Sequence, residues 1–289
     1  MNKNKWVGFS FLFGMAFLLF VLIQLPASWV LSQPSVKQLI EQSFNKTATQ
    51  SSHIHILASR GTIWNGEVDL AIQTKITRPG KTAQIANSVI NDFSIGRVNW
   101  NWQLSGLFLN KLAMDLNWNL ANSNLTGLVS TQLFSSQTSR SVMFKEVIGK
   151  ANLSQLSQNI QLPVFITSPV LQNLTGLVSV NQLNGVYVLN KHWFTGLDTD
   201  LQVDNLSVMN NVFPAIKIKT GFEKEKVLAR ISSQHHNWTL NGVASLTQQL
   251  IYSVDFNLNT QSEAVMPDWA FLMRKKSATN YVSRLQGRL

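Results

Sequence analysis

The chain has 289 residues, of which 45% are hydrophobic and 13% are charged, about half the ~25% charged residues usual for soluble domains. Sixteen Phe and nine Trp supply a large core, so the composition excludes a disordered chain. The lack of cysteine excludes disulfides, thiol catalysis and Cys-ligated zinc. A net charge of +10 without any nucleic-acid-binding motif gives no reason to expect a nucleic-acid partner.

The N-terminal part of the chain contains a long uncharged run at residues 6–25, apolar at all but two positions. In a helix this run spans ~30 Å, the thickness of a bilayer hydrocarbon core. Two lysines precede it and the next charged residue is Lys37. This asymmetry predicts a transmembrane helix at 6–25 with residues 1–5 in the cytoplasm and the remainder across the membrane. The alternative is a cleaved signal peptide, but the run exceeds the ~7–15 apolar residues of such a peptide.

The residues behind this run divide into a linker and a β-rich domain. Residues 26–50 are interpreted as the linker with a short helix at 35–44, where apolar residues fall near one face. Residues 51–289 form the predicted β domain. Within it, residues 80–93 fit either a helix or a strand covered by a loop, and the sequence does not decide between them.

Strict alternation of apolar and polar residues is the main signal of the β domain. It is seen at 98–104, 114–120, 216–219 and 254–259, where the polar partners are mostly Asn, Asp and Lys. Such a period of two is typical of strands with one apolar and one polar face. Gly, Asn, Ser and Asp separate the candidates, so antiparallel connections are expected. The prediction is a mainly β fold, and an open curved sheet or groove is one form that it allows.

A short sequence echo places glycines inside several strand-like stretches. The sequence LTGLVS at 125–130 returns at 174–179, and looser forms surround Gly106, Gly185 and Gly242. Glycine within a strand predicts a bulge, a bend or the close approach of another segment. The echo fits either a duplicated β unit or coincidence, and its irregular spacing excludes a solenoid with a fixed repeat.

One motif stands out at residues 60–68, which read RGTIWNGEV. Gly61 allows a tight turn leading into a strand. In that strand Thr62 and Trp64 would share one face and Ile63 would take the other. Trp64 would fill part of the core, and Gly66 would let a neighbouring segment approach closely. A structural role for the motif is the expectation, and direct contact with a partner is the alternative.

This motif, placed shortly after an N-terminal membrane span, resembles the type II secretion system protein N family. Residues 98–120, with Trp100, Trp102 and Trp118, look like that family's tryptophan-bearing strand pair around a Leu-rich turn. Residues 280–289 are similar to its closing strand. The resemblance implies a non-enzymatic accessory component of the bacterial inner membrane. Its β domain would lie in the periplasm, and it would support export of folded exoproteins across the outer membrane of Gram-negative bacteria.

No constellation of residues predicts catalysis, a cofactor or a metal. His53 and His55 would face the same way in a strand, but no acid or third His near them in sequence completes a site. His235 and His236 would point to opposite faces of a strand. The expected assignment is therefore no catalytic, cofactor-binding or metal-binding residue.

Two functions are compatible with these features. The first is non-covalent assembly with other inner-membrane secretion subunits, for which an exposed sheet edge could accept a partner strand. The second is binding or bridging of lipid, if the apolar face forms an uncovered groove. The basic residues after Asp268 are interpreted as solvated, or else as a contact for lipid headgroups or an acidic partner; they are Arg274, Lys275, Lys276, Arg284 and Arg288.

Overall fold

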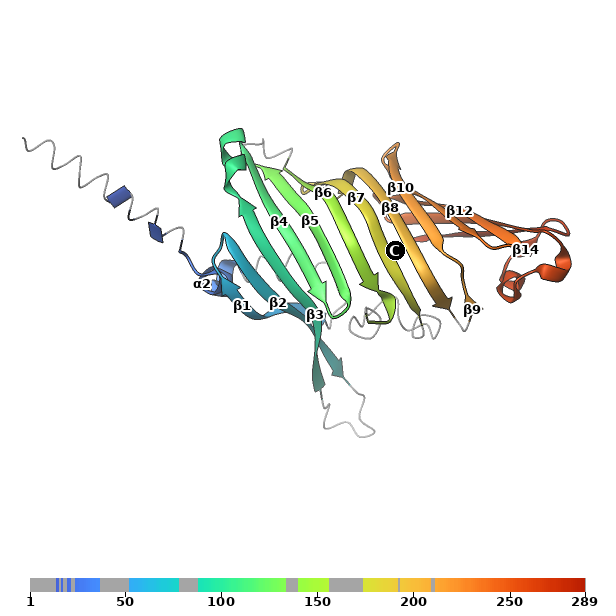
Figure 1. Ribbon diagram of the computed structural model, residues 1–289, viewed down its shortest axis with the longest axis horizontal. Coiled ribbons are helices and arrows are strands. Elements are labelled where there is room, and N and C mark those ends of the chain that lie inside the picture. Colours follow the sequence, from blue (N-terminus) through green and yellow to red (C-terminus); the bar gives the residue numbers. More distant parts are fainter. Residues whose placement is uncertain are drawn as a thin grey trace, which may run out of the picture. The chain divides into compact units, whose positions relative to one another are not determined.

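The computed structural model describes residues 14, 15, 17, 20, 21, 24–36, 52–77, 88–133, 140–155, 174–191, 193–208 and 211–288. The chain divides into two compact units, residues 1–102 and 103–289. Figure 1 labels the helices and strands of the chain. The predicted membrane span at 6–25 lies mostly outside the described residues. Among the residues that are described, no helix combines the length and apolar character needed to cross a bilayer.

The first unit contains one short helix and three antiparallel strands. These elements are α2 (Ala27–Ser32), β1 (Ser52–Gly61), β2 (Asn65–Thr77) and β3 (Ser88–Gln103). The strand alternative is confirmed for 88–93, while the rest of the undecided segment lies outside the described residues. The short helix predicted at 35–44 also falls almost wholly outside them. Helix α2 was not predicted, and its Ala27 is 1% exposed.

The second unit is one antiparallel sheet with the lateral order β4-β5-β6-β7-β8-β10-β11-β12-β13-β15-β14, and β9 pairs with β8. Its 3-10 helix η1 (Leu104–Leu109) is the Leu-rich turn of the sequence. The strands of this unit are β4 (Lys111–Leu120), β5 (Ser123–Gln132), β6 (Ser141–Asn152), β7 (Thr175–Val188), β8 (Trp193–Val208), β9 (Asn211–Val212), β10 (Ile216–Glu223), β11 (Lys226–Gln234), β12 (Trp238–Thr247), β13 (Ile251–Thr260), β14 (Arg274–Lys275) and β15 (Asn280–Arg288). The mainly β, antiparallel prediction is confirmed.

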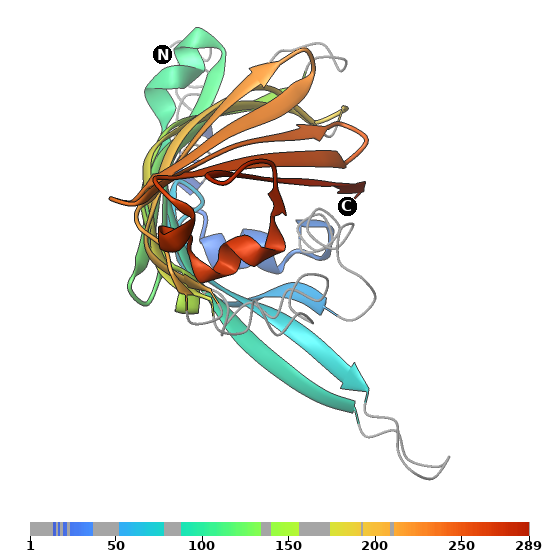
Figure 2. The ribbon, with the colours of Figure 1, turned by 90° about the vertical axis from the view of Figure 1, so that its right-hand side faces the viewer.

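The sheet of the second unit curves, and two 3-10 helices lie on its concave side (Figure 2). They are η3 (Glu263–Val265) and η4 (Asp268–Leu272). Ala270 of η4 packs with Trp238, Leu240, Leu258 and Tyr281, which are all buried. These side chains form a buried hydrophobic cluster between η4 and strands β12, β13 and β15.

Two glycines of the sequence echo mark irregular pairing in the second unit, whereas Gly185 and Gly242 pair in regular register. The pairing register shifts across Gly127 in β5 and across Gly176 in β7, as the echo predicts. A Cβ atom at Gly127 would come within 2.6 Å of the Val147 side chain, so close approach fixes this residue. Gly106 differs, because it belongs to η1 rather than to a strand.

Candidate functional site

The Gly61–Gly66 motif forms the hairpin turn that joins β1 to β2. Gly61 ends β1 with φ +81°, and it pairs directly with Gly66 in β2. The Thr62 and Asn65 backbones close the turn through a hydrogen bond from Thr62 N to Asn65 O of 2.8 Å. The expected strand, with Thr62 and Trp64 on one face, is therefore wrong. The three residues between Gly61 and Asn65 are the turn itself, and a left-handed glycine before them suits a short hairpin loop.

Trp100 of β3 packs against this turn. Its indole Nε1 donates a 2.9 Å hydrogen bond to the Ile63 carbonyl. A Cβ atom at Gly66 would lie 2.6 Å from the Trp100 ring and under 3 Å from two backbone carbonyl oxygens. The predicted close approach at Gly66 is confirmed. Trp64 is half-buried, and its carbonyl accepts a 2.8 Å hydrogen bond from the Trp102 N–H.

The same turn also contacts the end of the predicted membrane span. The Ile63 N–H donates a 3.0 Å hydrogen bond to the Leu25 carbonyl, and Pro26 forms a β-bridge with Thr62. The backbone of Ile63 is therefore fixed on both sides, by Leu25 through its N–H and by Trp100 through its carbonyl. The motif connects residues 25 and 26 directly to the first three strands.

A row of charged side chains crosses the same three strands. Arg97 Nε donates a 2.8 Å hydrogen bond to Asp69, while Arg60 pairs with Glu67 at 2.7 Å and Arg97 reaches Glu67 at 3.4 Å. These residues lie opposite one another in the pairing register. The hydrogen bond from Arg97 lowers the pKa of Asp69 below its ordinary value, against the opposing effect of partial burial.

In the second unit, one lateral row of facing residues runs across ten strands. Residues directly opposite in a sheet share a face, and along this row nearly every side chain is apolar or absent. Most of these side chains are half-buried. From β4 to β15 the row reads Trp118, Leu125, Gly149, Val180, Leu201, Ile218, Ile231, Gly242, Phe256 and Ser283. Trp118 is thus one end of a continuous apolar face.

The neighbouring row, on the opposite face, is polar at nearly every strand. Two ion pairs join adjacent strands there, Lys219 with Asp200 at 3.5 Å and Arg284 with Asp255 at 3.3 Å. From β7 to β15 this row reads Gln182, Asp200, Lys219, Arg230, Val243, Asp255 and Arg284. The alternation of polar and apolar residues in the sequence therefore gives this sheet one polar face and one apolar face.

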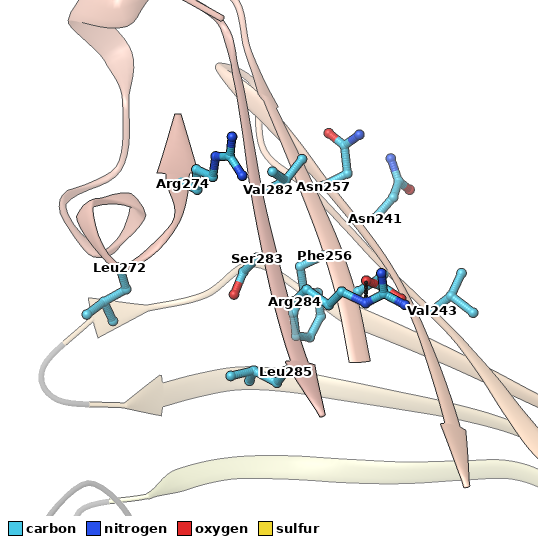
Figure 3. Close-up of a pocket in the computed structure, with 12 residues that line it drawn as sticks. Asn241, Val243, Phe256, Asn257, Leu272, Arg274, Val282, Ser283, Arg284 and Leu285 are labelled. Atoms are coloured by element: carbon cyan, nitrogen blue, oxygen red, sulfur yellow. Dashed lines mark ion pairs between the residues drawn. The ribbon is translucent and has the colours of Figure 1, made fainter. Parts of the chain in front are cut away.

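An open hollow of about 880 Å³ lies at the last strands of the sheet. Figure 3 shows residues from β12, β13 and β15 around it, with Leu272 from η4 and Arg274 from β14. Arg284 and Asp255 form their ion pair at this hollow. The five basic residues after Asp268 are all exposed, so the basic concentration in the sequence gathers at this end of the sheet.

The histidines form no metal site within the described part of the chain, where no group of three or more His, Asp or Glu side chains has suitable geometry. His53 and His55 both belong to β1. His235 and His236 lie in the β11–β12 turn rather than in a strand, and their ring centroids are 3.8 Å apart. The expectation that they point to opposite faces is therefore wrong, and His235 stacks on Trp238.

The fold defines a class of protein, an antiparallel β protein whose sheet has one polar and one apolar face. Its motif turn is hydrogen-bonded to Leu25 and forms a β-bridge with Pro26 of the N-terminal segment. The family described as type II secretion system (T2SS), protein N matches residues 53–267. The chain belongs to this family of secretion-system components. Comparison with curated proteins and with solved structures gave no significant match.

Proposed function

We propose that this protein is an accessory inner-membrane component of type II secretion that supports export of folded exoproteins through protein–protein contacts. The match to the protein N family over residues 53–267 carries this proposal. Its closest partners would be other subunits anchored in the same membrane. Its β domain would stand in the periplasm, with residues 1–5 in the cytoplasm.

The contact between Leu25 and Ile63 supports a specific role for the predicted membrane span. A hydrogen bond of 3.0 Å joins the end of that span to the motif turn, so little free chain would separate the membrane from the sheet. Restricting the domain to the membrane surface raises its effective concentration near other anchored subunits. The anchor would therefore position the domain rather than only retain it.

The test is deletion of the coding sequence, followed by assay of exoproteins in the culture medium. We expect exoproteins to accumulate in the periplasm and the full-length chain to restore export. A matched variant replaces residues 1–25 with a cleavable signal peptide, which releases the same domain into the periplasm. Export should then fall although the domain is present at the same level. Normal secretion after deletion would refute the proposal.

A second candidate function is binding or bridging of lipid by the apolar face. The observation in its favour is the row from Trp118 to Phe256, which stays half-buried at most positions. Native mass spectrometry of the detergent-extracted protein should then detect co-purifying lipid. Ile218→Asn on this face should reduce the amount of bound lipid, whereas Lys219→Asn on the polar face should leave it unchanged. Lipid-free protein would remove this candidate.

A further inference from the structure

Among the residues that the structure describes, strand β15 has an unpaired backbone edge along most of its length. Its other side is covered by β14, which pairs only at Arg274 with Val282 and at Lys275 with Tyr281. Along residues 283–288, β13 is the only strand paired with β15 in the part of the chain that the structure describes. An uncovered row of N–H and C=O groups is a template for another strand.

Two hydrogen bonds at the start of β15 show which residues face this edge. The Asn280 carbonyl accepts the Lys276 N–H at 2.9 Å, on the β14 side, whereas the Thr279 carbonyl accepts the Thr260 N–H at 2.9 Å. Residues alternate between the two sides of an antiparallel strand, and the β13–β15 register has no shift. Beyond β14, the N–H and C=O groups of Arg284, Gln286 and Arg288 therefore point outward.

The side chains along this edge differ between the two faces of the sheet. Arg284 lies opposite Asp255 on the polar face, and Gln286 and Arg288 share that face by alternation. Leu285 lies opposite Val254 on the apolar face and is 56% exposed. Leu272 and Phe271, from the nearby η4, are 69% and 75% exposed. A strand added here would meet cations on one face and apolar side chains on the other.

The positive charge near the edge is only partly neutralised by the described residues. Lys275 pairs with Glu263 and Arg284 with Asp255, while no described residue forms an ion pair with Arg274, Lys276 or Arg288. No acidic residue follows Asp268 in the chain. A second copy of β15 would set cations against cations, and like charges across an edge oppose pairing.

We propose that the edge of β15 binds an extended segment of a partner protein in which acidic residues alternate with apolar residues. Main-chain hydrogen bonds to Arg284, Gln286 and Arg288 would supply affinity, and the alternation would supply selectivity. The acidic side chains would face Arg284 and Arg288, and the apolar side chains would face Leu285. This inference rests on the proposed function and names the chemistry of the partner.

The first test measures hydrogen exchange of the purified full chain with synthetic peptides. The probes are the hexapeptides DVDLDV and KVKLKV and a permuted DDDVVL peptide. We expect DVDLDV to slow exchange at Arg284, Gln286 and Arg288 and the other two peptides to have little effect. Equal protection by all three peptides, or none by DVDLDV, would overturn the proposal.

Two sets of variants test the backbone and the charges separately. Gln286→Pro removes an outward N–H that is not used within the sheet and should weaken DVDLDV binding about tenfold or more, whereas Gln286→Ala should not. Arg284→Glu with Arg288→Glu should reverse the preference toward KVKLKV. Lys217→Glu with Lys219→Glu, on the polar face of β10, is the matched charge control. An unchanged preference after the double reversal would refute the charge argument.

Other occupants would give different results. Binding of phosphatidylglycerol vesicles that Gln286→Pro leaves intact, without peptide binding, would assign the cations to lipid headgroups instead. Crosslinks between two copies at residue 286 would assign the edge to self-association. Either result overturns the proposed strand partner. Neither alters the secretion assay of the deletion strain, which tests the proposed function independently.

Discussion

Substitution of Gly66 by Ala tests whether the motif turn is a packing site. The new Cβ atom would lie 2.6 Å from the Trp100 ring, 2.7 Å from the Thr62 carbonyl oxygen and 2.8 Å from the Arg60 carbonyl oxygen. Two of these three neighbours are backbone atoms of the hairpin, so they cannot move without disturbing it. Overpacking of this kind costs about 1–3 kcal/mol.

The matched control is Gly221→Ala in β10, because a Cβ atom at Gly221 would meet nothing within 4 Å. That substitution should be neutral or stabilise the protein by up to about 1 kcal/mol, through the restricted unfolded chain. Guanidinium unfolding of the detergent-solubilised full chain, followed by tryptophan fluorescence, compares the two variants. Hydrogen exchange then shows whether the loss of stability in Gly66→Ala is concentrated in β1 and β2.

The outcome separates two interpretations of the motif. We expect Gly66→Ala to lower the free energy of unfolding by about 1–3 kcal/mol and to speed exchange in the β1–β2 hairpin. If Gly66→Ala matched Gly221→Ala within about 0.5 kcal/mol, the size of an ordinary surface effect, the packing explanation would be refuted. A loss of secretion in a variant of unchanged stability would instead place the motif in a partner contact.

Three further predictions follow from other features. Leu258→Ala should lower the free energy of unfolding by about 2–5 kcal/mol because the side chain is 0% exposed, while Val243→Ala on the exposed polar face should change it little by the same denaturation assay. Arg97 lowers the pKa of Asp69, so the Arg97–Asp69 pair stabilises the folded state fully above pH 3.8, the ordinary Asp pKa. This stabilisation is lost as the pH falls from there through the lowered pKa of folded Asp69. The stability difference between wild type and Asp69→Asn should therefore shrink in acid, and a pH-independent difference would contradict this. Leu18→Arg with Leu19→Arg, each charge costing about 2.5–3.5 kcal/mol in a membrane span, should release the protein from membranes in alkaline carbonate extraction; retention would argue against the predicted anchor.

Local sequence patterns determined several of the strands and their two faces. At 114–120, 216–219 and 254–259, alternation alone predicted β4, β10 and β13, because successive side chains in any strand point to opposite sides. The Leu-rich turn between β3 and β4 was expected from the family resemblance rather than from alternation, and the structure forms it as η1. The family motif was visible as a pattern before its geometry was known.

Contacts between distant residues decided what the sequence left open. The GTIWNG stretch is locally compatible with a strand or with a turn, and the turn is selected by pairing of Gly61 with Gly66 and by contacts with Leu25 and Trp100. The side chains of His235 and His236 were predicted to point to opposite faces of a strand. They lie in a turn instead, and the turn brings their rings together.

The unpaired outer edge of β15 is the feature that could least be predicted without the tertiary structure. The basic residues near the C-terminus were visible in the sequence, but lateral strand order does not follow from chain order. Because β15 pairs with β13 along its length and with β14 at only two residues, the described part of the chain leaves the rest of the outer edge of β15 unpaired. The sequence by itself thus determined the β class, several of the strands with their two faces, and the family motif. Only long-range pairing decided which strand is free to meet a partner.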